Sequence, residues 1–92
     1  MITVKFYSLL RVILKVSELG VRREAGTVRE LLRLAQKQVK KRFLPKLIGK
    51  DGTLRQGVII LVNGKNILHL DNLATPVKAG DEVALFPPGG GG

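Results

Sequence analysis

The chain has 92 residues, of which 45% are hydrophobic, so we expect one globular domain and no room for a second. It contains no cysteine, which excludes a disulfide framework, a thiolate metal site and a cysteine nucleophile. Its formal charge of +9 favours an acidic protein surface, nucleic acid or anionic lipid as a partner.

The beginning of the chain alternates apolar and polar residues, and this period of two predicts a half-buried strand over residues 2–7. The segment lacks the basic head and long apolar run of a signal peptide or spanning helix, so we expect a cytoplasmic protein without a membrane partner. The apolar stretch 9–14 predicts a short helical turn that leads into a second strand near residues 19–23.

The central segment has the pattern of an amphipathic helix. Thr27 and Glu30 have the spacing of a capping box, which predicts a helix that starts at Thr27. The helix should continue to about Lys41 and cannot extend far toward Pro45. Its apolar positions recur at helical spacing and should pack on a sheet: Val28, Leu31, Leu32, Ala35 and Val39.

The last third of the chain predicts further strands. Residues 58–62 are apolar on both faces, which is typical of a strand inside a sheet. Asn63-Gly64 favours a tight hairpin, so residues 67–70 should return as a short antiparallel strand. A turn at 79–81 then precedes a last strand over 83–86. Two strands, one main helix and further strands indicate a mixed sheet in an α+β fold.

Several segments of the chain together resemble a known family. They are residues 4–11, 27–31, 61–67 and 75–83, and the ending 86–92, Phe-Pro-Pro-Gly-Gly-Gly-Gly. In these segments the chain resembles the ubiquitin-like sulfur carriers of the MoaD and ThiS type, above all the small subunit of molybdopterin synthase. The resemblance implies a β-grasp fold, in which one main helix packs across a mixed four- to five-stranded sheet. It also implies a domain over residues 1–86 and a flexible tail over 87–92.

The resemblance implies that the carboxyl terminus carries the chemistry. An E1-like adenylating enzyme would use ATP to activate the Gly92 carboxylate, and a sulfur donor would convert it to a thiocarboxylate. Gly91 and Gly90 lack a Cβ atom and could thread a narrow channel in that partner. Six residues from Pro87 to Gly92 could reach about 20 Å. The protein would be a co-substrate in a synthase with a large, MoaE-like subunit, would not be an enzyme itself, and would bind no cofactor.

Several functions remain open for such a tail. The leading hypothesis is delivery of sulfur to a molybdopterin or tungstopterin precursor. One alternative is a modifier conjugated through Gly92 to lysines of other proteins, and another is a sulfur carrier for tRNA thiolation. A third is a basic nucleic-acid-binding module whose glycine tail is incidental. Gly89 and Gly90 stand where relatives usually have bulkier or polar residues, and they should add slack to the tail.

Two surfaces are candidates for partner contacts. Phe86, Ile67 and Pro87 could dock on a partner beside the tail, although Phe86 and Ile67 could instead belong to the core. A basic face on the predicted helix could contact RNA or an acidic partner, or could simply be solvated. It consists of Arg29, Arg33, Lys37, Lys40 and Lys41, and Arg42, Lys46 and Lys50 extend it. His69 has no second ligand type at metal spacing, so we expect an ordinary strand residue and no metal site.

Overall fold

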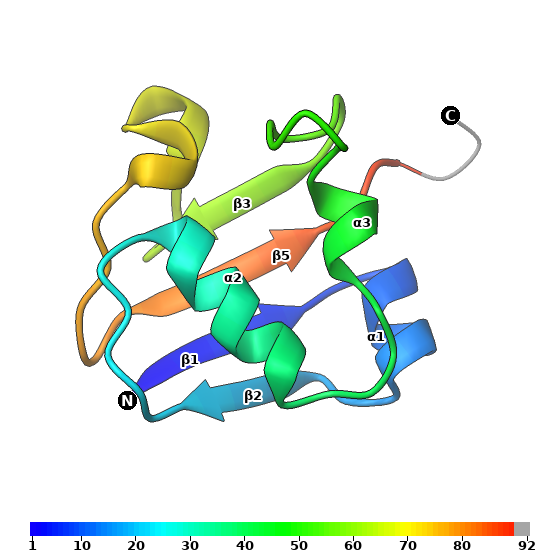
Figure 1. The fold of residues 1–92 in the computed structure, drawn as a ribbon, viewed down its shortest axis with the longest axis horizontal. Helices are drawn as coiled ribbons and strands as arrows, with labels where there is room; N and C mark the ends of the chain where they lie inside the picture. Colours follow the sequence, from blue (N-terminus) through cyan, green and yellow to red (C-terminus); the bar gives the residue numbers. More distant parts are fainter. Residues whose placement is uncertain (90–92) are drawn as a thin grey trace.

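The computed structural model describes residues 1–89 and contains a five-stranded mixed sheet with the strand order β2-β1-β5-β3-β4. The central strands β1 and β5 run parallel, and every other neighbouring pair is antiparallel (Figure 1). The bounds are Ile2–Phe6 for β1, Glu18–Val21 for β2, Ile59–Val62 for β3, Lys65–Asn66 for β4 and Glu82–Phe86 for β5. The sheet confirms the expected α+β class and β-grasp arrangement.

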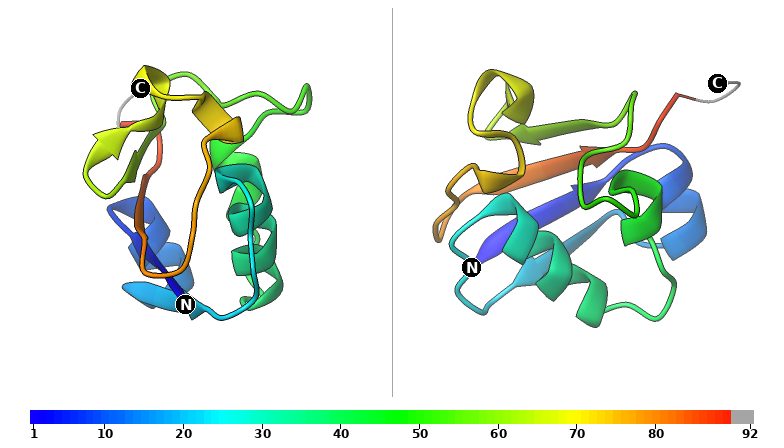
Figure 2. Two further views of the ribbon diagram at one scale, coloured as in Figure 1. Left: turned by 90° about the vertical axis from the view of Figure 1, so that its left-hand side faces the viewer. Right: turned by 45° about the horizontal axis from the view of Figure 1, so that its top comes forward.

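The main helix α2 (Val28–Lys37) forms a second layer over one face of the sheet (Figure 2, left). Its start confirms the predicted cap, because Thr27 Oγ1 accepts a hydrogen bond from the Glu30 N–H at 3.2 Å. Glu30 in turn accepts from the N–H of Gly26, the residue before the cap, at 3.1 Å. The buried side of α2 packs into one core with inward residues of the strands; it consists of Val28, Leu31, Leu32 and Ala35.

The helix ends at Lys37, four residues before the expected end near Lys41. The Gln36 side chain explains the early end, because its Oε1 accepts from the N–H groups of Phe43 and Leu44 at 2.8 and 3.0 Å. These bonds hold the chain in a turn that places the Phe43 ring in the core, 5.3 Å from the Phe6 ring. Burial of that aromatic side chain outweighs two or three further residues of exposed helix.

Two short helices flank the sheet at the end where β1 and β5 finish (Figure 1). The helix α1 (Leu9–Leu14) confirms the expected helical turn, and β2 follows it close to the expected position. The helix α3 (Leu44–Leu47) was not expected. Pro45 lies in its first turn, where proline is tolerated because the early N–H groups of a helix have no helical partner.

The predicted hairpin forms, but the return strand is much shorter than expected. Asn63 and Gly64 have φ of 49° and 83° and connect β3 to β4, which has only two residues. The prediction of a strand over residues 67–70 is wrong, because Ile67–His69 is a 3-10 turn, η1. The Asn66 side chain accepts from the Leu68 N–H at 2.9 Å, and this cap starts the turn.

The main helix α2 lies on one side of the sheet, and the opposite side is called here the outer face (Figure 2, left). Residues of β3 alternate in burial, so Ile59 remains 43% exposed on the outer face while Ile60 is fully buried. The predicted position inside the sheet is confirmed, because β3 lies between β5 and β4, but the apolar residue Ile59 is not buried there. Among residues 1–89, no helix has the length and apolar character needed to cross a membrane.

Candidate functional site: the exit of the carboxyl-terminal tail

The tail leaves the domain at the end of β5, close to α1 and α3 (Figure 1). Strand pairing stops after Phe86, because Pro87 has no N–H to donate to a neighbouring strand. Pro87 is buried, so the exposed part of the tail begins at Pro88. The predicted tail residues Gly90, Gly91 and Gly92 lie outside the described residues, and their roles stay predictions.

Pro88 passes close to the loop that precedes β3. A Cβ atom built on Gly57 would lie 3.6 Å from the Cα atom of Pro88, within ordinary van der Waals contact. Gly57 also has a φ of 87°, which residues with a side chain rarely adopt. The start of the tail is thus held against the domain by the burial of Pro87 and passes next to the loop at Pro88.

An aromatic stack lies beside the exit. Tyr7 and Phe86 lie side by side at the ends of the parallel strands β1 and β5. Their rings stack with centroids 4.4 Å apart and an angle of 11° between the planes. The Arg11 guanidinium carbon lies 5.3 Å from the centroid of the Tyr7 ring, and its Nε donates to the Phe6 carbonyl at 3.3 Å. These contacts fix the direction in which β5 delivers the tail.

An apolar strip extends from this stack over the outer face. Ile59 is paired with Phe86 in the β3·β5 register, and Leu61 is paired with Ala84. We define the outer strip as Tyr7, Ile59, Leu61, Ala84 and Phe86. Its members range from 43% exposed at Ile59 to nearly buried at Ala84, so the strip is a shallow apolar surface immediately next to the tail.

The structure separates the three residues predicted to dock. Phe86 is half-buried on the outer strip and can contact a partner. Ile67 is fully buried, so its side chain belongs to the core, and the predicted docking role has no surface to act through. Pro87 is buried as well and supports the tail. Sequence reasoning missed Tyr7 and Ile59, although strict alternation from Phe6 and Ile60 would have placed both on the outer face.

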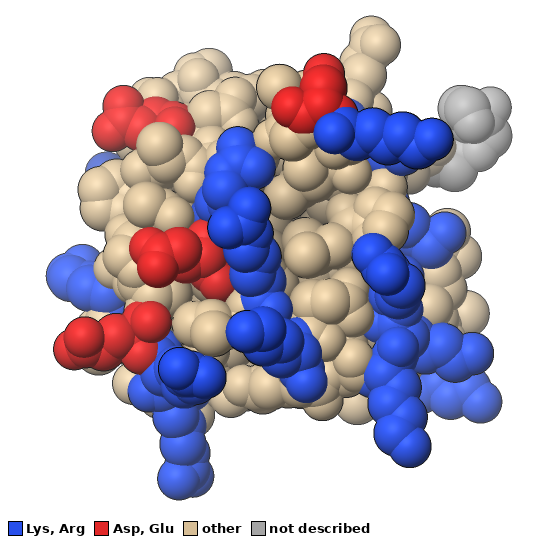
Figure 3. Space-filling view, viewed as in Figure 1, with Lys and Arg blue, Asp and Glu red and all other residues tan. Residues whose placement is uncertain are grey.

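The predicted basic face is split by the early end of α2. Arg29, Arg33 and Lys37 recur every four residues along α2, but Lys40 and Lys41 lie beyond its end. In Figure 3, Lys and Arg side chains run along α2 and flank a hollow of uncharged surface on the side of α3. Arginines from the loops around α3 join those of the helix there, so the basic surface is a groove between elements instead of one helix face.

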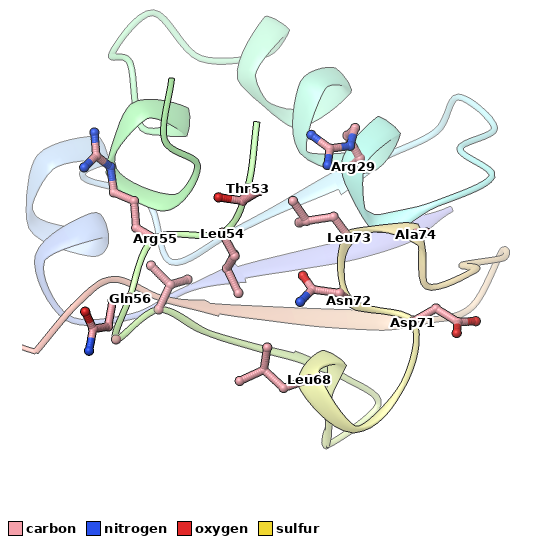
Figure 4. Close-up of a pocket in the computed structure, with 12 residues that line it drawn as sticks. Arg29, Thr53, Leu54, Arg55, Gln56, Leu68, Asp71, Asn72, Leu73 and Ala74 are labelled. Carbon is pink, nitrogen blue, oxygen red and sulfur yellow. The ribbon is translucent and has the colours of Figure 1, made fainter. Parts of the chain in front are cut away.

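A neighbouring hollow of about 510 Å³ lies between the loop before β3 and the two 3-10 turns (Figure 4). Leu54, Leu68 and Leu73 point into it, and Arg55 turns its guanidinium away from it toward α3. Asp71 lies at its rim. The hollow therefore combines an apolar floor with both signs of charge, and no single chemistry dominates it.

One buried carboxylate has a structural role at the end of the sheet away from the tail. Asp81 is 6% exposed and accepts hydrogen bonds from Asn63 Nδ2 at 3.0 Å and the Lys78 N–H at 2.9 Å. The Asn63 hydrogen bond first, and then the donors and charge of Lys78, hold the pKa of Asp81 below its usual value. His69 lies in η1, and residues 1–89 contain no group of three or more His, Cys, Asp or Glu residues that could hold a metal ion.

A β-grasp sheet with an apolar strip beside a glycine-rich terminus is the arrangement of a ubiquitin-like sulfur carrier or modifier. The ThiS family model matches residues 4–92, and the chain belongs to this family. A candidate sulfur carrier protein of Archaeoglobus fulgidus is 36% identical over 75 residues, which are 82% of this chain and 84% of that protein. Small archaeal modifier protein 3 of Haloferax volcanii is 44% identical over 43 residues, 47% of each chain.

Solved structures show the same fold. SAMP1 from Haloferax volcanii has a TM-score of 0.78 and 26% identity, with coverage of 99% of this chain and 98% of that chain. A chain of the Amycolatopsis orientalis BexX/CysO complex has a TM-score of 0.82 at 20% identity, with both chains covered completely. The likeness to the chain from the Amycolatopsis orientalis complex concerns the fold alone. The relatives found by these comparisons are sulfur carriers and small modifiers.

Proposed function

We propose that this protein is a sulfur carrier whose Gly92 carboxylate is adenylated and then converted to a thiocarboxylate. The observation that carries the proposal is that the ThiS family match extends through the final glycine. The relative from Archaeoglobus fulgidus supports it, since the similarity covers most of both chains. The tail exit supports it too, because the stacked rings of Tyr7 and Phe86 and the buried Pro87 lie where the chain leaves β5, and Pro88 and Gly89 after them are exposed.

The chemistry requires activation by a partner. A carboxylate is a poor electrophile, so an E1-like enzyme joins it to AMP from ATP and releases pyrophosphate. Hydrosulfide supplied by a sulfur donor then attacks the Gly92 carbonyl carbon, AMP leaves with the electrons of the broken C–O bond, and loss of the proton on sulfur leaves the thiocarboxylate. Delivery of the sulfur to an acceptor returns Gly92 to a carboxylate, with water as the source of the oxygen. The chain contributes no catalytic side chain to these steps and presents the reacting carboxylate.

We propose that the outer strip is where the activating enzyme and the acceptor enzyme bind. Its exposed apolar atoms lie beside the exit, so a partner that covers the strip would receive the tail directly. The acceptor in the leading hypothesis is a molybdopterin or tungstopterin precursor held by a large, MoaE-like synthase subunit. A tRNA or another sulfur acceptor would use the same carrier chemistry with a different partner.

The test is incubation of the purified chain with ATP, an E1-like enzyme and a sulfur donor, followed by intact mass spectrometry. We expect replacement of one oxygen by one sulfur in the full chain and no change in a variant that lacks Gly91 and Gly92. An unchanged mass in a reaction where another carrier of the family is converted would contradict the proposal. Copurification of the native partner then identifies the acceptor.

A second candidate function is a protein modifier that is joined through Gly92 to lysine amines. The similarity to small archaeal modifier protein 3 and to SAMP1 favours it. The acyl-adenylate is common to both functions, and the nucleophile distinguishes them: a sulfur donor or an amine. Proteomics of cells that express the chain should find glycine remnants of its tail on lysines if it is a modifier, and none if it acts as a carrier alone.

A further inference from the structure

A basic groove of about 450 Å³ lies between the exposed side of α2 and the segment that contains α3. Its ten lining residues include five cations and no acidic residue; the cations are Arg29, Arg33, Arg42, Lys50 and Arg55. Leu44, Pro45 and Ile48 form an apolar floor. The cations come from the helix, the loop after it and the loop after α3, so the fold alone brings them together (Figure 3).

The acidic residues near the groove are engaged in local hydrogen bonds. Glu30 accepts from the Gly26 N–H at the start of α2. Asp51 accepts from the N–H and the hydroxyl of Thr53 at 3.0 and 2.8 Å, and these bonds hold the pKa of Asp51 below its usual value. Within residues 1–89 the ion pairs are Lys5–Glu82 and Lys78–Asp81, and both lie outside the groove. None of the five cations forms an ion pair within residues 1–89, although Asp51 lies close enough to Arg55 for their charges to interact.

One of the arginines is held in place before any ligand binds. Arg55 donates from its Nε to the Pro45 carbonyl at 2.6 Å, which fixes its guanidinium beside α3. Arg29 is half-buried, and one of its terminal nitrogens lies 3.8 Å from the position of a Cβ atom on Gly52. Less side-chain entropy is lost on binding when the donors are already positioned.

We propose that this groove binds the phosphodiester backbone of a polynucleotide. Four of the five cations are arginines, whose planar guanidinium groups match the oxygens of a phosphate in a bidentate arrangement. Centres of protein interfaces are depleted in charge and enriched in aromatic anchors, whereas nucleic-acid interfaces are strongly positive. The groove has half of its lining in cations and no aromatic residue, so it contacts phosphates and does not stack bases.

The position of the groove places a bound strand close to the tail. Arg55 and Gly49 also line another hollow, different from the one in Figure 4, and Pro88 lines it too. The groove and the start of the tail therefore adjoin each other. A polynucleotide in the groove would pass beside the segment that leads to Gly92. The proposal concerns binding alone and holds whether or not Gly92 becomes a thiocarboxylate.

The test is fluorescence anisotropy with a fluorescein-labelled single-stranded RNA and, in a second arm, a labelled DNA duplex. The groove variant carries Arg33→Glu and Arg42→Glu, and both of these side chains are exposed. The matched control carries Arg23→Glu and Lys65→Glu, which make the same change in net charge outside the groove. We expect the groove variant to raise Kd at least about tenfold more than the control, because it replaces phosphate contacts by repulsion. Thermal unfolding followed by circular dichroism checks that both variants fold.

The salt dependence gives a second measure. Five phosphate contacts predict that log Kd for single-stranded RNA changes with log salt concentration with a slope of magnitude roughly 3, reduced by about 1 to 2 in the groove variant. A chain without Gly91 and Gly92 should bind as the full chain does, and it separates this proposal from sulfur transfer. Equal losses in the groove and control variants would show diffuse charge and overturn the proposal. Binding of poly-L-glutamate without binding of RNA or DNA would overturn it in favour of an acidic protein.

Discussion

The ring of Tyr7 stacks on the ring of Phe86 with centroids 4.4 Å apart, and the pair joins the end of β1 to the end of β5 where the tail begins. Stacked aromatic pairs contribute about 0.5–1.5 kcal/mol beyond the area they bury. A double-mutant cycle of Tyr7→Ala and Phe86→Ala should therefore give a coupling free energy of about 1 kcal/mol by urea unfolding. A cycle of Tyr7→Ala with Leu70→Ala should be additive; coupling of equal size there would show that the stack has no specific contribution.

The outer strip makes a prediction about partner binding. Ile59 and Leu70 are both 43% exposed, but only Ile59 lies on the outer strip. We expect Ile59→Ala to raise the KM of the activating enzyme for this carrier by about fivefold to tenfold, which corresponds to about 1 kcal/mol of lost apolar contact. Leu70→Ala is the matched control and should leave KM unchanged. Equal effects of the two substitutions would place the docking surface elsewhere.

The buried position of Ile67 separates a core role from a docking role. We expect Ile67→Ala to lower the free energy of unfolding by about 2–5 kcal/mol, because it leaves a cavity in the core. Leu68→Ala, next in the chain and 57% exposed, should change it by less than about 0.5 kcal/mol. If Ile67→Ala instead unfolds at the same urea concentration as the native chain, the core assignment of Ile67 is incorrect.

The sequence predicts the parts of this fold whose causes are local. Alternation places β1, the turn at 79–81 and the apolar run after it place β5, the Thr27 cap places the start of α2, and Asn63-Gly64 places the hairpin. The end of α2 depends on hydrogen bonds that the Gln36 side chain accepts from residues seven and eight positions later, which no local pattern reveals.

The same distinction applies to the functional surfaces. The glycine tail can be recognised from the sequence alone. The outer strip beside it forms only because β1, β5 and β3 are neighbours in the sheet. The sequence pattern predicts a strand at Ile67. The Asn66 cap starts a turn there instead, and the Ile67 side chain is buried in the core. The sequence predicts four of the five groove cations as part of a basic surface, but not Arg55 or the groove itself, which depend on the loop after α3.

The Asp81 carboxylate makes stability depend on pH. Its folded pKa is lowered, mainly by the hydrogen bond from Asn63, so its contribution is complete above the unfolded pKa of about 3.9 and is lost as pH falls through the folded value. Asp81→Asn should lower the unfolding free energy at pH 7 by about 1–3 kcal/mol, since it leaves buried donors poorly matched. The difference from the native chain should shrink as pH falls below the unfolded pKa of about 3.9. A constant difference across this range in urea unfolding would exclude the carboxylate as its cause.

Gly89 offers a test of how the slack in the tail affects activation. Among residues 1–89, apart from the chain neighbour of Gly89, no atom lies within 4 Å of a Cβ built at this position, so alanine clashes with none of them. Alanine has fewer backbone conformations to lose when an activating enzyme grips the tail, a difference of about 0.4–1 kcal/mol. Gly89→Ala should therefore lower the KM for activation about twofold to fivefold with kcat and the unfolding midpoint unchanged. Gly57→Ala is the contrasting variant: its φ of 87° should make alanine destabilise the fold by about 1–2 kcal/mol. A rise in KM for Gly89→Ala would mean that the bound tail needs a glycine conformation at this residue.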